Sequence, residues 1–227
     1  MFRFVSKAVC GLALVATPAL AQISSSDPVI TRGGQGWSLY SGQTVGAGSD
    51  VIAAQLGWPG LWFTYLHGMA SPLDFGVRLT AINYGFEGRT SEVVPGMKLQ
   101  LVARISLLNQ GRFNLGFEFA PGPLVYFRPF SVTQWGLALP LKLQMGLGVG
   151  SAMMVNFGLD FPMFVAFEAA GIPGSLYLPI LVGGGVEYFI DQRLAISFNL
   201  KMGPSIRTLP SATAFALDAL IGVAYKF

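Results

Sequence analysis

The dominant pattern in this sequence is an alternation of apolar residues with small or polar ones, with a period of two. It is clearest at the C-terminal end, where one alternate set is apolar throughout. That set is Leu217, Ala219, Ile221, Val223, Tyr225 and Phe227, and the other set is Asp218, Leu220, Gly222, Ala224 and Lys226. A period of two places successive side chains on opposite faces of a β-strand. The stretch therefore predicts a strand with one continuous apolar face.

The same alternation recurs along most of the chain and predicts ten strands separated by turn-forming residues. They are expected at 48–58, 61–68, 73–86, 95–108, 112–126, 135–149, 153–168, 176–190, 193–207 and 213–227. The first two segments are short and poorly phased, so eight strands remain an alternative. Long alternating segments with one apolar face are typical of barrels whose outer surface meets lipid. The sequence thus predicts an all-β fold, a transmembrane antiparallel up-and-down β-barrel.

Composition supports this fold class and excludes others. Charged residues make up 11% of the chain and apolar residues 52%, whereas soluble domains carry roughly 25% charged residues. After the N-terminal region no apolar run reaches the length of about 18 residues that marks a membrane-spanning helix. The formal charge of +3 is spread along the chain without a Lys/Arg cluster, so no nucleic-acid partner is expected.

The N-terminal residues predict an export signal. Arg3 and Lys7 precede an apolar stretch at 8–16, and Ala19-Leu20-Ala21 supplies a small-x-small cleavage site. We expect 1–21 to be a signal peptide. The chain's one cysteine, Cys10, would leave with it, so the mature chain would have no thiol for catalysis or cross-linking.

The segment after the signal, 22–44, is rich in Ser, Gly and Gln and has no period. It predicts an irregular N-terminal segment that lies in the periplasm or folds partly into the barrel lumen. Whether it plugs the barrel is left open. The barrel domain is expected to cover 45–227.

The C-terminal strand resembles the last strand of outer-membrane β-barrel proteins of Gram-negative bacteria. In that superfamily, a C-terminal Phe preceded by residues of matching phase is the signal read by the barrel assembly machinery, and Ile221, Val223, Tyr225 and Phe227 match it. The resemblance implies export to the outer membrane and contact with outer-membrane lipid. It also implies recognition by the assembly machinery, and we expect a monomer.

Connections between the expected strands fall into two kinds. Tight turns are expected at Asn109-Gln110-Gly111, Gly150-Ser151-Ala152 and Asp191-Gln192, and longer connections at 87–94, 127–134, 168–175 and 208–212. Barrels of this kind keep short turns in the periplasm and longer loops outside. The Trp58-Pro59-Gly60 hairpin is short on the side where long loops are allowed.

Charged residues in the strands fall on the face opposite the apolar one. They are Asp74, Arg78, Lys98, Arg104, Glu118, Lys142, Asp160, Glu168, Glu187, Lys201, Asp218 and Lys226. All but Asp74 and Glu168 form the predicted lumen charge network, in which neighbouring strands mostly pair opposite signs. Two interpretations remain open: a polar filling that conducts nothing, or a narrow passive pore lined by mixed charge.

Glycines also gather on the inward face. They are Gly146, Gly148 and Gly150 on one strand and Gly158, Gly183 and Gly185 on the next two. Glycine in a barrel wall permits curvature, and here it would leave room for long side chains such as Arg104 from the opposite wall. The alternative function for this bare patch is a channel or a lipid-sized cleft.

No catalytic, cofactor or metal site is predicted. The chain's one histidine, His67, is expected at the periplasmic end of the second strand, where Tyr65 and Trp62 suggest an interfacial position. Ser71 and Asp74 lie in and after the following turn, without the constellation that acyl-transfer chemistry requires. The sequence predicts a non-enzymatic structural barrel or narrow pore. The alternatives are a surface-binding barrel acting through 87–94 and 127–134, or a lipid-modifying enzyme.

Overall fold

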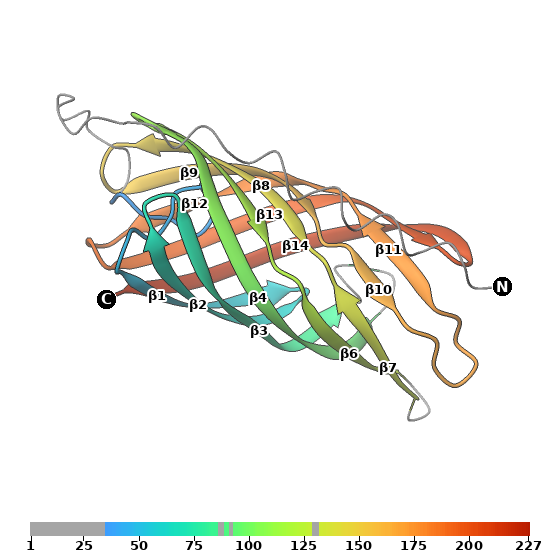
Figure 1. Ribbon diagram of the computed structural model, residues 1–227. Helices are drawn as coiled ribbons and strands as arrows, with labels where there is room; N and C mark the ends of the chain where they lie inside the picture. Colours follow the sequence, from blue (N-terminus) through green and yellow to red (C-terminus); the bar gives the residue numbers. More distant parts are fainter. Residues whose placement is uncertain (1–34, 86–88, 91–92, 129–131) are drawn as a thin grey trace, which may run out of the picture. The chain divides into compact units, whose positions relative to one another are not determined.

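The computed structural model describes residues 35–85, 89–90, 93–128 and 132–227, which lie within one compact unit, Thr31–Phe227. Over these residues the protein is an antiparallel β-barrel of ten strands, closed on itself (Figure 1). None of the described residues forms a helix long and apolar enough to span a membrane. The predicted signal peptide and residues 22–34 lie outside the described part.

Six of the ten strands are continuous. They are β1 (Asp50–Trp58), β2 (Gly60–Ala70), β3 (Leu73–Gly85), β4 (Val93–Gln110), β13 (Leu194–Thr208) and β14 (Ser211–Lys226). The other four are each divided into two elements. They are β5 (Phe113–Phe119) with β6 (Gly122–Arg128), β7 (Val132–Ala138) with β8 (Leu141–Val149), β9 (Met153–Phe161) with β10 (Phe164–Ala166), and β11 (Ser175–Pro179) with β12 (Leu181–Phe189). The prediction of ten strands is confirmed, and the alternative of eight is wrong.

The last strand closes the barrel against the first. β1 and β14 pair from Val51–Lys226 to Trp58–Ala219. At the end of this ladder, Asp50 and Phe227 exchange backbone hydrogen bonds of 3.1 and 2.9 Å. The C-terminal strand is therefore the closing strand, as its alternation predicts.

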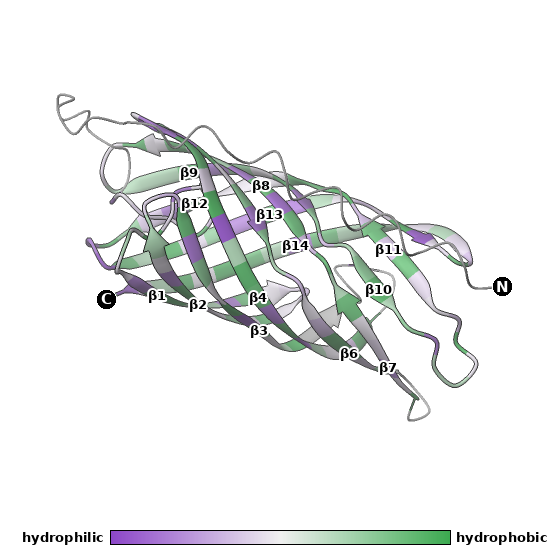
Figure 2. Cartoon of the chain, in the orientation of Figure 1, coloured by the Kyte–Doolittle hydropathy of each residue, from purple (hydrophilic) through white to green (hydrophobic). Residues whose placement is uncertain are grey.

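The two faces of the wall differ in polarity. Figure 2 shows hydrophobic residues along every strand, interrupted by hydrophilic bands. Large exposed apolar side chains occur all around the barrel, among them Ile52, Leu56, Phe63, Val77, Leu99, Leu101, Phe117, Trp135, Leu147, Phe157, Val182, Phe198, Phe215, Ile221 and Phe227. Monomeric soluble proteins rarely expose apolar surface of this extent. Most of the buried polar and charged residues alternate with this set and face the lumen.

The connections define two ends, which we call the turn end and the loop end. The turn end holds the connections 71–72, 111–112, 150–152 and 190–193 and the C-terminal residue. The loop end holds Pro59 and the connections 86–92, 129–131, 167–174 and 209–210, of which 86–88, 91–92 and 129–131 lie outside the described residues.

The expectation of a long connection at 208–212 is wrong. The ladder between β13 and β14 continues to the Thr208–Ser211 pair, so only Leu209 and Pro210 connect the two strands. The expected loop 127–134 is also largely strand, because β6 extends to Arg128 and β7 begins at Val132. Both connections are shorter than expected, because the strand pairs extend to Arg128–Val132 and to Thr208–Ser211.

Four prolines lie where the divided strands break. Pro121, Pro140 and Pro162 fall between the paired elements, and Pro179 ends β11. Proline has no N–H to donate to a ladder, so it interrupts β-pairing. We call these four residues the proline seam. The breaks are absent from the sequence-based expectation, since the inward and outward phase is unchanged across each of them.

Candidate functional site: the barrel lumen

The turn end of the lumen is filled by the chain itself. Residues 37–45, which we call the plug, precede β1 and are buried throughout, with Trp37, Ser38, Ser41 and Val45 fully inaccessible. In Figure 1 this segment lies near the barrel end that carries the C-terminus. The sequence left two positions open for 22–44, the periplasm and the lumen. The plug residues of this segment lie in the lumen.

Arg104 is the main anchor of the plug. Its guanidinium donates hydrogen bonds of 2.7–3.0 Å to three plug carbonyls, those of Ser38, Leu39 and Gln43. It also forms a buried ion pair of 2.8 Å with Asp74. The Arg104 guanidinium thus donates to backbone oxygens of the plug and to a carboxylate of the neighbouring strand.

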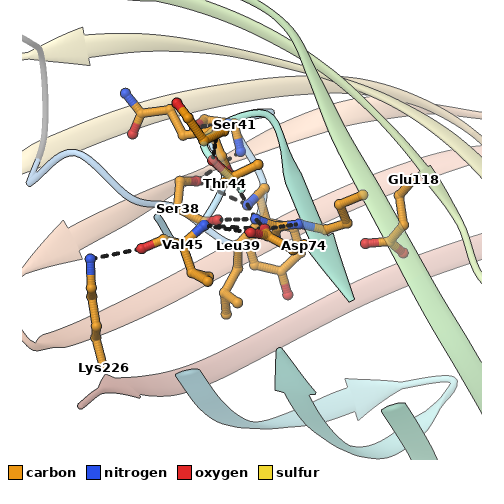
Figure 3. Close-up of polar contacts among 12 residues, drawn as sticks. Ser38, Leu39, Ser41, Thr44, Val45, Asp74, Glu118 and Lys226 are labelled. Carbon is orange, nitrogen blue, oxygen red and sulfur yellow. Dashed lines mark hydrogen bonds and ion pairs between the residues drawn. The ribbon is translucent and has the colours of Figure 1, made fainter. Parts of the chain in front are cut away.

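Carboxylates and a lysine on other strands hold the remaining plug backbone (Figure 3). Asp74 accepts the Val45 N–H at 3.0 Å, and Glu187 accepts the Leu39 N–H at 2.9 Å as well as a plug serine hydroxyl. Lys226 donates to the Val45 carbonyl at 2.7 Å. Charge-assisted hydrogen bonds of this kind are stronger than neutral ones. The plug is therefore fixed from β3, β4, β12 and β14.

Two wall glycines let the plug approach closely. A Cβ on Gly146 would overlap Ser41, and a Cβ on Gly116 would overlap Gly42, whose own φ is +84°. Gly146 thus makes room for the plug and not for a long side chain from the opposite wall. This role of Gly146 depends on its contact with the plug. The alternating pattern of the strands gives no indication of that contact.

The middle of the lumen holds two buried ion-pair groups. Glu118 accepts two hydrogen bonds from Arg78, of 2.8 and 3.2 Å, and forms an ion pair of 3.1 Å with Lys142. Asp160 and Lys201 form a second pair at 2.8 Å. Arg78 reaches Glu118 across the intervening β4, so these pairs are not confined to adjacent strands.

The other predicted network residues lie elsewhere. Arg104, Glu187 and Lys226 contact the plug, as described above. Asp218 faces the lumen opposite Lys201 in register, and its Oδ1 is buried without a hydrogen-bond partner among the described residues. Glu168 is exposed in the connection 167–174, because β10 already ends at Ala166, so its expected inward position is wrong.

A tryptophan lies among three cations in the middle of the lumen. Trp62 is 8% exposed, and its ring centroid is 5.6–5.9 Å from Lys142, Arg78 and Lys98. Cations over an indole face are attracted by its quadrupole. Trp62 shares the inward parity of Thr64 and faces the lumen, so it does not lie at the membrane interface beside His67.

His67 has a partner that the sequence did not suggest. Its Nδ1 lies 2.8 Å from Asp50 Oδ1, which also accepts the Tyr65 hydroxyl at 2.6 Å. Asp50 and His67 are directly opposed in the β1–β2 hairpin, and hairpin register is the signal that could have found the pair. An Asp–His pair orients a base in acyl-transfer triads, yet none of the described hydroxyl groups is hydrogen-bonded to His67.

The loop end is filled by an aromatic cluster, which we call the cap. Phe164 and Tyr177 stack with centroids 4.3 Å apart, and Tyr126 lies 6.2 Å from Phe164. All three are buried inside the wall with Leu124 and other apolar residues. The lumen thus holds three layers: plug, charged middle and cap.

A small cavity remains between the charged middle and the proline seam. It offers about 40 Å³, enough for a few water molecules at roughly 10–15 Å³ each. Its lining includes Trp62, Lys98, Asp218, Pro140 and Pro162. A space of this size interrupts the filling of the lumen without connecting its two ends.

Comparison with known proteins adds no relative. No protein-family model matches the chain, and no curated protein matches it. The function is therefore inferred from the geometry of the lumen and of the outer surface.

Proposed function

We propose that this protein is a closed, non-enzymatic structural β-barrel of the outer membrane of a Gram-negative bacterium. The observation that carries this proposal is the filling of the lumen by plug, charged middle and cap, with a cavity of about 40 Å³ beside the charged middle. A chain that fills its own barrel leaves no passage for solutes, and ten strands enclose little more than the eight whose interior side chains can fill. This favours the structural barrel over the narrow pore.

The membrane location is supported by the two faces of the wall. The outward residues are large and apolar, whereas Arg78, Lys142 and Lys201 are buried within. A Lys or Arg facing lipid at the bilayer midplane would cost about 2–4 kcal/mol. The predicted export signal at 1–21 and the C-terminal Phe support an outer-membrane location, and lipid and the assembly machinery are the proposed partners.

Conductance in planar lipid bilayers tests the closed barrel. Refolded wild-type protein, with its fold verified by a heat-dependent mobility shift on a gel, is expected to insert without unitary current steps. A matched variant whose plug is replaced by a Gly/Ser segment of equal length shows whether the plug contributes to closure. Stable steps from the wild-type protein would contradict the proposal.

Replacing Phe227 by Ser is expected to lower the amount of barrel in the outer membrane several-fold. Its side chain is 58% exposed, so the substitution removes little buried packing, and its proposed role is recognition during assembly. Refolding into detergent, where no machinery takes part, should be unchanged. Immunoblotting of membrane fractions measures the first effect and the gel shift the second.

Phe215 provides the matched control for this prediction. It lies on the same strand, faces outward and is 51% exposed. Phe215→Ser should leave the membrane level close to wild type. Equal losses from both variants would show that general hydrophobicity, and not the terminal signal, determines assembly.

A further inference from the structure

We propose that the outer face of the barrel beside the β1–β2 hairpin binds one phospholipid of the periplasmic leaflet, selected by an ethanolamine-type headgroup with a primary ammonium. An acyl chain would lie in an apolar groove around Ala54, and the ammonium group would bind Asp50 and His67. This inference rests on the membrane location proposed above, since the occupant is drawn from the bilayer.

The groove forms where a small residue lies among large ones on the outward side of the wall. Ala54 has Ile52 and Leu56 as its outward neighbours along β1, and it lies opposite Phe63 on β2 and Val223 on β14. Neighbours on one face of a sheet are close enough for their side chains to meet. A single methyl group among four larger side chains therefore leaves a depression in the surface.

Two open parts of one groove meet at this depression. The larger part offers about 620 Å³ and extends toward the turn end, where Tyr65 lines it. The smaller part offers about 370 Å³ and extends the other way, to Leu56 and Ile221. Ala54 and Val223 line both parts. Small-molecule sites have volumes of about 300–1,000 Å³, so each part is large enough for a bound chain.

The groove has the length of one lipid leaflet. From Asp50 at the turn end to Leu56, β1 advances roughly 20 Å at about 3.3 Å per residue. A strand tilted by about 45° then covers roughly 14 Å of depth, close to half of a hydrocarbon core of about 30 Å. An acyl chain whose headgroup lies at the turn end would thus end where the groove ends. This length fits a lipid of the periplasmic leaflet.

Two hydrogen-bond acceptors lie at the turn end of the groove. Asp50 Oδ1 accepts the Tyr65 hydroxyl at 2.6 Å and lies 2.8 Å from His67 Nδ1. Because a carboxylate has no hydrogen to donate, Nδ1 carries the proton, and Nε2 of the neutral ring is an acceptor. Asp50 Oδ2 and His67 Nε2 have no hydrogen bond within the described part of the chain. Both side chains are partly exposed, at 25% and 45%, so both atoms are accessible to a headgroup.

Two acceptors, one of them anionic, favour a cationic donor. A primary ammonium has three N–H donors and a positive charge, so it satisfies Oδ2 and Nε2 together. A choline-type headgroup has no N–H, and a glycerol-type phospholipid carries a net negative charge that Asp50 repels. Tyr65 connects the two halves of the site, because its hydroxyl holds Asp50 and the residue also lines the groove. The chemistry therefore selects the ethanolamine-type lipid.

Native mass spectrometry of lipid adducts tests this selection. The mature barrel, refolded in detergent, is titrated with dioleoyl phospholipids that carry an ethanolamine, choline or glycerol headgroup. The first ethanolamine-lipid adduct is expected at about tenfold lower lipid concentration than the other two, which corresponds to about 1.4 kcal/mol and is the scale of one hydrogen bond to a charged group. Equal or reversed preference would overturn the proposal.

Variants with matched controls separate the site from general lipid contact. Asp50→Asn should abolish the headgroup preference, whereas Asp191→Asn, in an exposed turn at the same end, should keep it. Ala54→Phe should weaken the binding of all three lipids several-fold by filling the groove. Ala103→Phe, on the outward face of β4 and outside the groove, should not. A preference that survives Asp50→Asn, or binding that ignores Ala54→Phe, overturns the proposal.

The same samples distinguish the two levels of inference. A wild-type barrel that is heat-modifiable and inserts into lipid vesicles, but shows no headgroup preference, overturns the lipid site alone. Failure of the refolded protein to insert into vesicles overturns the membrane barrel and the lipid site together. Ala54→Leu serves as a milder filling variant if Ala54→Phe does not fold.

Discussion

Glu118→Gln is expected to lower the free energy of unfolding of the barrel by about 3–5 kcal/mol, the range for breaking a buried ion pair from one side. Glu118 is 1% exposed, accepts two hydrogen bonds from Arg78 and forms an ion pair with Lys142. The amide that replaces it carries no charge, so two buried cations lose their common counter-ion beside Lys98. Urea unfolding of the protein in lipid vesicles, followed by the gel mobility shift, measures the change.

A surface carboxylate and a double variant serve as controls. Glu168 is exposed in the connection 167–174, and Glu168→Gln should change stability by less than about 0.5 kcal/mol. Arg78→Met combined with Glu118→Met removes both partners, and its loss should be smaller than the sum of the two single losses. Strict additivity would show that Arg78 and Glu118 do not stabilise each other.

Arg104→Met is expected to release the plug. The substitution removes the donors to three plug carbonyls and leaves the Asp74 carboxylate buried without its cation. We expect the free energy of unfolding to fall by about 3–5 kcal/mol. Ser41→Cys reports on release, because Ser41 is fully buried and the predicted mature chain has no other thiol. A maleimide should leave Cys at this position unmodified in the parent protein and label it rapidly when Arg104 is replaced.

Two further variants make this prediction specific. Arg193 is exposed at the same end of the barrel, and Arg193→Met should leave the plug thiol protected. Gly146→Val displaces the plug by steric overlap with position 41 and alters no charge. This variant too should increase labelling of the plug thiol. A thiol that stays protected in both Arg104→Met and Gly146→Val would show that the plug is held by neither contact.

Strand number and facing were accessible from the sequence because alternation is a local property. Leu194 to Met202 and Leu217 to Phe227 carry their inward and outward positions in every second residue, whatever the rest of the chain does. The breaks at Pro140 and Pro162 were not accessible in the same way, because each proline keeps the phase of its strand while removing a donor. The period of the sequence determines which face of the wall a residue lies on. It does not determine where the pairing between strands is interrupted.

Partners across the lumen were beyond the reach of alternation for a related reason. Glu118 and Glu187 have the same inward parity, yet one pairs with Arg78 and the other holds the plug. Which inward residues meet depends on their height along the barrel, which strand tilt and stagger determine together. The plug itself has no period, so Arg104 could be assigned to the lumen but not to the carbonyls that it binds.

The hydrogen bond from Lys226 to Val45 joins residues separated by 181 positions, and it has a consequence for the order of folding. Val45 belongs to the segment that precedes all the strands, whereas Lys226 lies on the strand that closes the barrel. The plug therefore cannot complete its contacts until β14 is in place, although it is synthesised before any strand. A segment near the start of the described chain thus reaches its final position only when the closing strand is in place, and the seated plug marks a barrel whose last strand has been added.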